Sequence, residues 1–182
     1  RIDMCGVGYV NQLYGTDYEL RCLQRRHARF VNTTMMVTLL GAAVSDTLAD
    51  GRVVSGVGGQ YNFVAMAHAL PDARAIVCVR ATREKAGRVT SNIVWNYPQA
   101  TIARHLRDIV VTEYGVADLR SATDSEVIQR LLNIADSRFQ DELLAAAQAA
   151  GKVARDYRIP AQHRHNTPGR IASVFAIPRS AG

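Results

Sequence analysis

Four short apolar segments, separated by stretches of helical character, constrain the fold of this chain most strongly. They lie at residues 30–40, 74–79, 89–95 and 109–112. These segments are rich in Val, Ile and Thr, which favour strands. Short apolar strands that alternate with helices are typical of an α/β domain with an open, mostly parallel sheet and flanking helices. Ligands bind such sheets at the carboxyl ends of strands, so we expect the chemistry in the loops over 55–62 and 112–118.

Shorter elements complete the expected order. Residues 42–44 are interpreted as a short returning strand, and a helix over 35–48 is the competing interpretation. A strand is expected over 52–55, and a helix over 63–70 that ends at a proline. A further short helix is expected over 99–106.

Two sequence signatures predict helix starts in the last third of the chain. Thr123 precedes Glu126 by three residues ahead of an apolar-periodic stretch, which is the pattern of a capping box. Ser137 and Gln140 repeat this spacing, and Gly151 suits the end of the second helix.

The sequence divides into three parts. Residues 1–29 begin without a helix start or a strand boundary, so we expect this N-terminal segment to continue from a missing upstream domain. Residues 30–156 form the α/β domain. Residues 157–182 carry prolines, histidines and arginines with little periodicity and are expected to form an irregular tail.

Composition excludes several classes of protein. The 182 residues are 48% hydrophobic and 21% charged, which is enough for a buried core and unlike a collagen-like, disordered or disulfide-scaffold chain. The longest apolar run, at 35–44, is far shorter than the ~20 residues that cross a bilayer, so we expect no membrane partner. Three cysteines without CxxC spacing favour a reducing compartment, and we expect a cytoplasmic protein.

The chain is basic, and its positive charge is almost entirely arginine. Lys and Arg number 22 against 16 acidic residues, which gives a net charge of +6, and Lys85 and Lys152 are the only lysines. Arginine suits bidentate recognition of phosphate. The alternative is a set of solvated surface charges with no ligand.

A glycine-rich loop, Gly56-x-Gly58-Gly59, stands between an expected strand and an expected helix. Backbone N–H groups at a helix N-terminus bind anions or stabilise an oxyanion. The loop matches neither a Walker loop nor the G-x-G-x-x-G spacing. A tight turn without a ligand is the alternative.

Gly58-Gly59-Gln60 is also the tripeptide of peptide-chain release factors, which hydrolyse an ester on transfer RNA. Here its surroundings are apolar, and no Lys or Arg occurs over 61–73, so phosphate groups would find little neutralising charge. We therefore expect no nucleic-acid partner.

Glu113 directly follows a buried strand, where a carboxylate is placed for nucleophilic or acid–base work. The alternative is a structural carboxylate that pairs with an arginine such as Arg88 or Arg104, or that caps a loop. A metal site is not expected, because His163 and His165 lack a third ligand nearby.

Two motifs together resemble the acetyl-CoA hydrolase/transferase family. They are Ser-Gly-Val-Gly-Gly-Gln-Tyr-Asn-Phe at 55–63 and Val-Thr-Glu-Tyr-Gly-Val-Ala-Asp-Leu at 111–119. The resemblance covers roughly residues 30–151 and implies the C-terminal, CoA-transferase-like domain of a two-domain enzyme. It also implies that a glutamate attacks an acyl-CoA thioester, giving an acyl–glutamyl anhydride and then a glutamyl-CoA thioester that a small carboxylate or water resolves. Coenzyme A is then a substrate, and no tightly bound cofactor is expected.

The resemblance also assigns roles to residues. The family's nucleophilic glutamate lies upstream of the glycine loop, which here means before Arg1, so this chain alone is expected to be inactive. Glu113 matches an active-site glutamate that orients substrate or water. Gly58, Gly59 and Gln60 would form the oxyanion and CoA-binding loop.

Two asparagines match the family's substrate pocket. Asn32 matches a pocket position, and Asn62 stands where the family usually carries an aspartate. An amide keeps hydrogen bonds but removes the charge, so altered acyl specificity and a non-catalytic domain both stay open.

The expected partners are acyl-CoA, a small carboxylate or water, and the missing N-terminal domain, with a homodimer left open. The alternative function is a module that binds CoA or a nucleotide without chemistry, and ester hydrolysis on the ribosome is a remote third. The sequence does not distinguish a transferase from a hydrolase.

Overall fold

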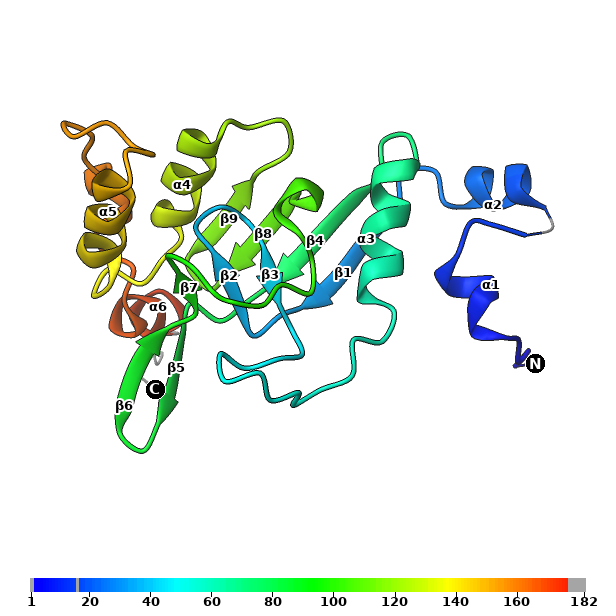
Figure 1. The fold of residues 1–182 in the computed structure, drawn as a ribbon, viewed down its shortest axis with the longest axis horizontal. Coiled ribbons are helices and arrows are strands. Elements are labelled where there is room, and N and C mark those ends of the chain that lie inside the picture. Colours follow the sequence, from blue (N-terminus) through cyan, green and yellow to red (C-terminus); the bar gives the residue numbers. More distant parts are fainter. Residues whose placement is uncertain (1, 16, 177–182) are drawn as a thin grey trace, which may run out of the picture.

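The computed structural model describes residues 2–15 and 17–176, and its centre is a four-stranded sheet (Figure 1). The strands, in spatial order, are β1 (Arg29–Thr33), β4 (Arg74–Cys78), β8 (Ile109–Thr112) and β9 (Gly115–Asp118). The first three are parallel, and β9 returns antiparallel to β8 through a tight hairpin that the sequence analysis missed. The prediction of a mixed α/β fold with a mostly parallel sheet is confirmed.

Two smaller sheets extend from this centre. One contains β3 (Ala43–Val44), β2 (Met36–Thr38) and β7 (Ile93–Val94), in that order. The other is a hairpin of β5 (Thr82–Lys85) and β6 (Arg88–Ser91), which projects from the body of the molecule (Figure 1). Because residues 36–38 and 43–44 are strands, the competing helix over 35–48 is wrong.

The helices that touch the central sheet cover one of its faces. Helix α3 (Gln60–Ala69) packs on β1 and β4, and α4 (Asp124–Asn133) packs on β9 and on α5 (Gln140–Ala149). Helices α1 (Val7–Asn11) and α2 (Tyr18–Gln24) lie at the opposite end of the molecule from α5 (Figure 1).

Helix α4 shows how sequence pattern becomes packing. Its buried residues Val127, Ile128, Leu131 and Leu132 recur at helical spacing and form one apolar face in the main core. The predicted capping box is confirmed: the Thr123 hydroxyl accepts a hydrogen bond from the Glu126 N–H, and the Glu126 carboxylate accepts one from the Thr123 N–H.

Two expected elements are absent from the described residues or shorter than predicted. Residues 52–55 form no strand, because only Val53 pairs, in an isolated bridge to Thr47, and its side chain stays 68% exposed. The helix over 99–106 is reduced to a 3₁₀ turn at Arg104–Leu106. Its preceding residues are extended because Ile102 bridges Ala43 at the edge of the small sheet.

The second capping signature does not form a capping box. The spacing predicted a helix that starts directly after Ser137, but α5 begins at Gln140, and Phe139 occupies the N-cap position and makes no side-chain cap. The buried Gln140 amide instead donates to the carbonyl groups of Leu132 and His163, both at 2.9 Å. Both side chains of the signature, Ser137 and Gln140, thus form tertiary hydrogen bonds in place of a capping box.

The segment that starts at residue 157 packs back against the α/β domain. Ile159 is buried in the main core, a 3₁₀ turn spans Ala161–His163, and α6 (Pro168–Phe175) follows. Asn166 and Ser137 exchange backbone and side-chain hydrogen bonds of 2.8–2.9 Å. The start of α6 is therefore fixed to the turn that precedes α5.

A buried carboxylate joins the amino-terminal ends of the central strands. Asp108, whose side chain is fully buried, precedes β8 and accepts hydrogen bonds from the guanidinium groups of Arg74 and Arg120 and from the Ala75 N–H. Arg74 begins β4, and Arg120 follows β9. One side chain thus links three strands.

Removing this carboxylate should be costly. We expect Asp108→Ala to lower the free energy of unfolding by about 3 kcal/mol, because it leaves the buried Ala75 N–H without an acceptor and removes the buried carboxylate that Arg74 and Arg120 share. Urea unfolding of this chain measures the loss. Asp141→Ala, which breaks an exposed pair with Arg164, is the matched control and should cost less than about 1 kcal/mol. Equal losses would contradict this role for Asp108.

Candidate functional site

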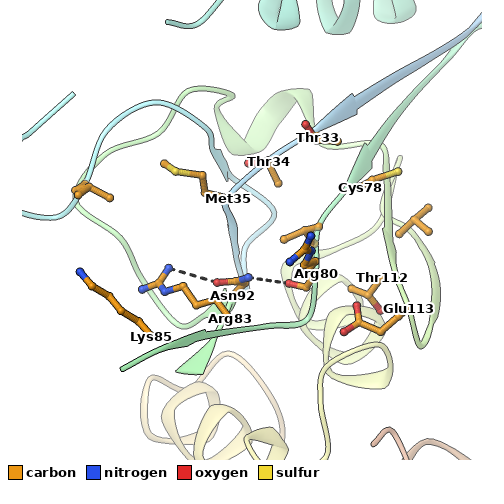
Figure 2. Close-up of a pocket in the computed structure, with 13 residues that line it drawn as sticks. Thr33, Thr34, Met35, Cys78, Arg80, Arg83, Lys85, Asn92, Thr112 and Glu113 are labelled. Atoms are coloured by element: carbon orange, nitrogen blue, oxygen red, sulfur yellow. Dashed lines mark hydrogen bonds between the residues drawn. The ribbon is translucent and has the colours of Figure 1, made fainter. Parts of the chain in front are cut away.

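A cleft of about 880 Å³ lies at the carboxyl ends of the three parallel strands (Figure 2). Thr33 ends β1, Cys78 ends β4 and Thr112 ends β8, and all three line it. This is the edge at which parallel sheets bind ligands. The register of the strands therefore brings together side chains that are about eighty residues apart in sequence.

Glu113 lies in this cleft, at the turn between β8 and β9. It is exposed, and its carboxylate accepts a hydrogen bond of 2.9 Å from the Ala81 N–H. The turn is held by Thr112, whose hydroxyl donates to the Ile134 carbonyl and accepts from the Tyr114 N–H. The suggested ion pair with Arg88 or Arg104 does not form among the described residues, and Arg104 pairs with Asp124 instead. The bond from the Ala81 N–H is the loop-capping contact that the sequence analysis gave as the other alternative.

Three cations line the cleft: Arg80 near Glu113, and Arg83 and Lys85 farther from it (Figure 2). Arg83 donates to the side-chain oxygen of Asn92 at 3.3 Å and lies 3.1 Å from the Met36 sulfur, both neutral groups. None of the three cations pairs with a carboxylate among residues 2–15 and 17–176. Glu113 is the one carboxylate among the described lining residues, so the cleft is net positive and suited to an anionic ligand.

The sequence analysis missed these cations and Asn92. Asn92 is buried and fixes the local chain, because its amide donates to the Arg80 carbonyl at 3.0 Å (Figure 2). The available signal was a group of basic residues directly after a buried strand. Its meaning depended on the β5–β6 hairpin folding back beside the cleft.

The glycine loop lies beside this cleft and does not line it. Gly58 is exposed with a φ of +59°, and Gly59 precedes the first residue of α3, packed against Asn11 and Phe63. Gln60 is buried, and its amide donates to the carbonyl of Thr33, which lines the cleft. This hydrogen bond links the loop to the edge of the cleft.

The two asparagines lie away from Glu113. Asn32 is on the β1 face that carries Phe30, toward α3, and its amide nitrogen is buried without a hydrogen-bond partner among the described residues. Asn62, on α3, lines a separate, small pocket with Asn11 and Tyr14. The structure does not bring either of them to the cleft.

Tyr114, next to Glu113, is held by a buried acid. Its hydroxyl donates to Asp136 at 3.0 Å, and Arg138 pairs with the same carboxylate at 2.8 Å. Burial and the hydrogen bond to Asp136 raise the pKa of Tyr114 well above its usual range. Burial disfavours the Asp136 anion, but hydrogen bonds from Arg138 and Tyr114 outweigh it and lower the pKa of Asp136. Tyr114 is therefore a fixed, neutral side chain at neutral pH.

Residues 1–147 match the family described as the acetyl-CoA hydrolase/transferase C-terminal domain. This chain belongs to that family. The 4-hydroxybutyrate coenzyme A transferase of Clostridium kluyveri is 30% identical over 145 residues, which cover 79% of this chain and 32% of that protein. The probable butyrate:acetyl-CoA coenzyme A-transferase of Syntrophomonas wolfei is 33% identical over 121 residues, which cover 65% and 27%.

Solved structures of similar fold and sequence also match this chain. The crystal structure of RipA from Yersinia pestis matches with a TM-score of 0.67 and 30% identity, over 80% of this chain and 31% of that one. A 4-hydroxybutyrate CoA-transferase from Porphyromonas gingivalis matches with a TM-score of 0.59 and 26% identity, over 79% and 30%. The chain spans between 27% and 34% of the length of the curated relatives that it matches.

The described residues contain neither a helix that could span a membrane nor a cluster of metal-binding side chains. No helix there is long and apolar enough to cross a membrane. No group of three or more His, Cys, Asp or Glu side chains in that part of the chain is arranged to hold a metal ion.

Proposed function

We propose that this chain is the C-terminal domain of a CoA-transferase whose cleft binds acyl-CoA and passes CoA through a glutamyl-CoA intermediate. The observation that carries the proposal is the cleft itself, which gathers one carboxylate and three cations at the carboxyl ends of parallel strands. The names of the relatives favour transfer to a carboxylate over hydrolysis by water.

The cations would bind the phosphate groups of CoA. Arg83 offers a planar fork of donors that suits phosphate, and Lys85 offers a mobile point charge. Both lie on β5, and Arg80 lies just before it, so the hairpin presents its charge to the cleft. CoA bound with its phosphates here would direct its thioester toward Glu113.

Glu113 would orient the reacting groups. A glutamate from the upstream part of the polypeptide attacks the thioester carbonyl, and the CoA thiolate leaves. The thiolate then attacks the resulting anhydride at the enzyme's own carbonyl, which releases the acyl group as a carboxylate. We expect Glu113, whose carboxylate accepts from the Ala81 N–H, to accept a further hydrogen bond from water or from another reacting group that carries a proton.

The glycine loop and the asparagines have supporting roles in this proposal. The N–H groups of Gly58 and Gly59 stand at the start of α3, where they would stabilise an oxyanion, with Gln60 fixing the loop to the end of β1. The amide of Asn32 is buried on the α3 side of β1, so a role in the substrate pocket would need this side chain to turn toward the cleft. Asn62 would line its own pocket beside Asn11 and Tyr14, separate from the cleft.

An upstream domain would cover the open face of the central sheet. Val31 is 62% exposed and Val116 is 65% exposed, both on the face opposite α3. Parallel sheets normally bury both faces. Thr33 and Cys78 share this open face and line the cleft, so a domain packed there would close the cleft from above and bring in its nucleophile.

A binding module without chemistry is the second candidate. Asn62 favours it, because an amide stands where the family usually has a carboxylate. The two candidates share CoA binding and differ in turnover.

Lys85→Ala should weaken CoA binding to this chain about fivefold, which corresponds to about 1 kcal/mol for one solvated charge–phosphate contact. Isothermal titration calorimetry at low and high salt measures it, and the difference should shrink as salt rises. Lys152→Ala, which removes the other lysine far along the chain from the hairpin, should leave the Kd unchanged. An equal effect of both changes would contradict a phosphate site on the hairpin.

Glu113→Gln should slow thiol release from acetyl-CoA at least about a hundredfold in the polypeptide that joins this chain to its upstream part. The amide keeps the size of the side chain but is a poor acceptor for a transferred proton. Glu84→Gln, an exposed change on the neighbouring hairpin, is the control and should leave the rate unchanged. Full turnover by Glu113→Gln would overturn the role of Glu113.

A further inference from the structure

A second hollow adjoins Glu113 on the side of the C-terminal helix. Its volume is about 330 Å³, and Glu113 and Tyr114 form one side of it. Pro168, Ile171, Ala172 and Phe175, all from α6, form the other. Glu113 borders both this hollow and the cationic cleft, so the two spaces adjoin at this residue.

Hydrogen bonds fix the start of α6 to the rest of the domain. Asn166 fixes the segment that leads into the helix, since its amide donates to the carbonyl groups of Asn133 and Ala135 at 2.8 and 3.0 Å. The Thr167 hydroxyl then caps the helix by accepting from the Arg170 N–H, and Pro168 begins it. The position of α6 thus follows from contacts with the helical part of the domain.

The lining of this hollow is apolar on both sides. The Tyr114 hydroxyl donates to Asp136, so the aromatic ring is the part of this side chain left to line the hollow. Opposite it, Ile171 and Phe175 offer side chains that face no core, and Phe175 is 76% exposed. Apart from the Glu113 carboxylate, the hollow has no charged side chain among its described lining residues. Such a surface recognises a hydrocarbon group.

We propose that the hollow between Tyr114 and α6 is the acyl-chain subsite and that Ala172 and Phe175 set the length of acyl group accepted. This inference rests on the proposed function. The phosphates of CoA lie on the cationic side of Glu113, its thioester lies near the carboxylate, and the hydrocarbon tail of an acyl group of butyryl size or larger lies against α6.

The position of α6 in the sequence supports a role in specificity. The match to the family ends at residue 147, and α6 spans residues 168–175. The wall of the hollow is therefore supplied from outside the part of the chain that defines the family. A segment of this kind can differ between members without disturbing the shared reaction.

The test compares two substrates in the polypeptide that joins this chain to its upstream part. Ala172→Phe places a ring in the hollow, so the ratio of kcat/KM for hexanoyl-CoA to that for acetyl-CoA should fall at least about tenfold. Phe175→Ala removes apolar contact with a longer chain and should lower the same ratio. Val174→Phe, on the same helix but outside the hollow and 66% exposed, is the matched control, with the ratio unchanged within about twofold.

The outcomes separate this inference from the proposed function. An unaltered protein that turns over acyl-CoA, with a ratio that neither variant changes, would overturn the acyl subsite alone. Equal losses on both substrates would also overturn it, because the helix would then act on the reaction rather than on chain length. An unaltered protein without thioester turnover would overturn the proposed function, and this inference with it.

Discussion

Parallel pairing of β1, β4 and β8 is the constraint on which the rest of the structure depends. The pairing aligns Asn32 with Val77 and Val77 with Val110, so the three strands end at one edge. Asp108 holds the opposite edge by joining the residues that begin β4 and follow β9. The register places Glu113 and Arg80 at the aligned edge, because Glu113 directly follows β8 and Arg80 comes two residues after the end of β4.

The charges around the cleft at that edge are unevenly distributed, and on the proposed function this distribution would orient a substrate. Cations without a carboxylate partner among the described residues lie on and before β5, a carboxylate lies at the β8–β9 turn, and apolar side chains of α6 lie beyond it. Acyl-CoA has the same order of chemistry: phosphates, a thioester and a hydrocarbon group. The proposed match therefore lies in the order of these features along the cleft, and a cleft that was only positively charged would not provide it.

The sequence predicted local features well and tertiary ones less well. The Val- and Ile-rich segments became β4 and β8, and the capping box of α4 formed, since both depend on neighbouring residues. The strand over 52–55 failed because no partner strand reaches it, and Ser137 lost its cap to a hydrogen bond with Asn166. Glu113 was identified as a candidate from its place after a strand. Arg83 was not, because its proximity to Glu113 arises only when the hairpin folds back.

The most direct test of this account is to locate the covalent intermediate. The complete polypeptide would be incubated with acetyl-CoA, the reaction stopped with borohydride, and the modified glutamate identified by peptide mass spectrometry. The account predicts a single modified glutamate upstream of this chain, with Glu113 unmodified. Modification of Glu113 would contradict it, because that residue would then be the nucleophile and the cleft would not depend on an upstream domain.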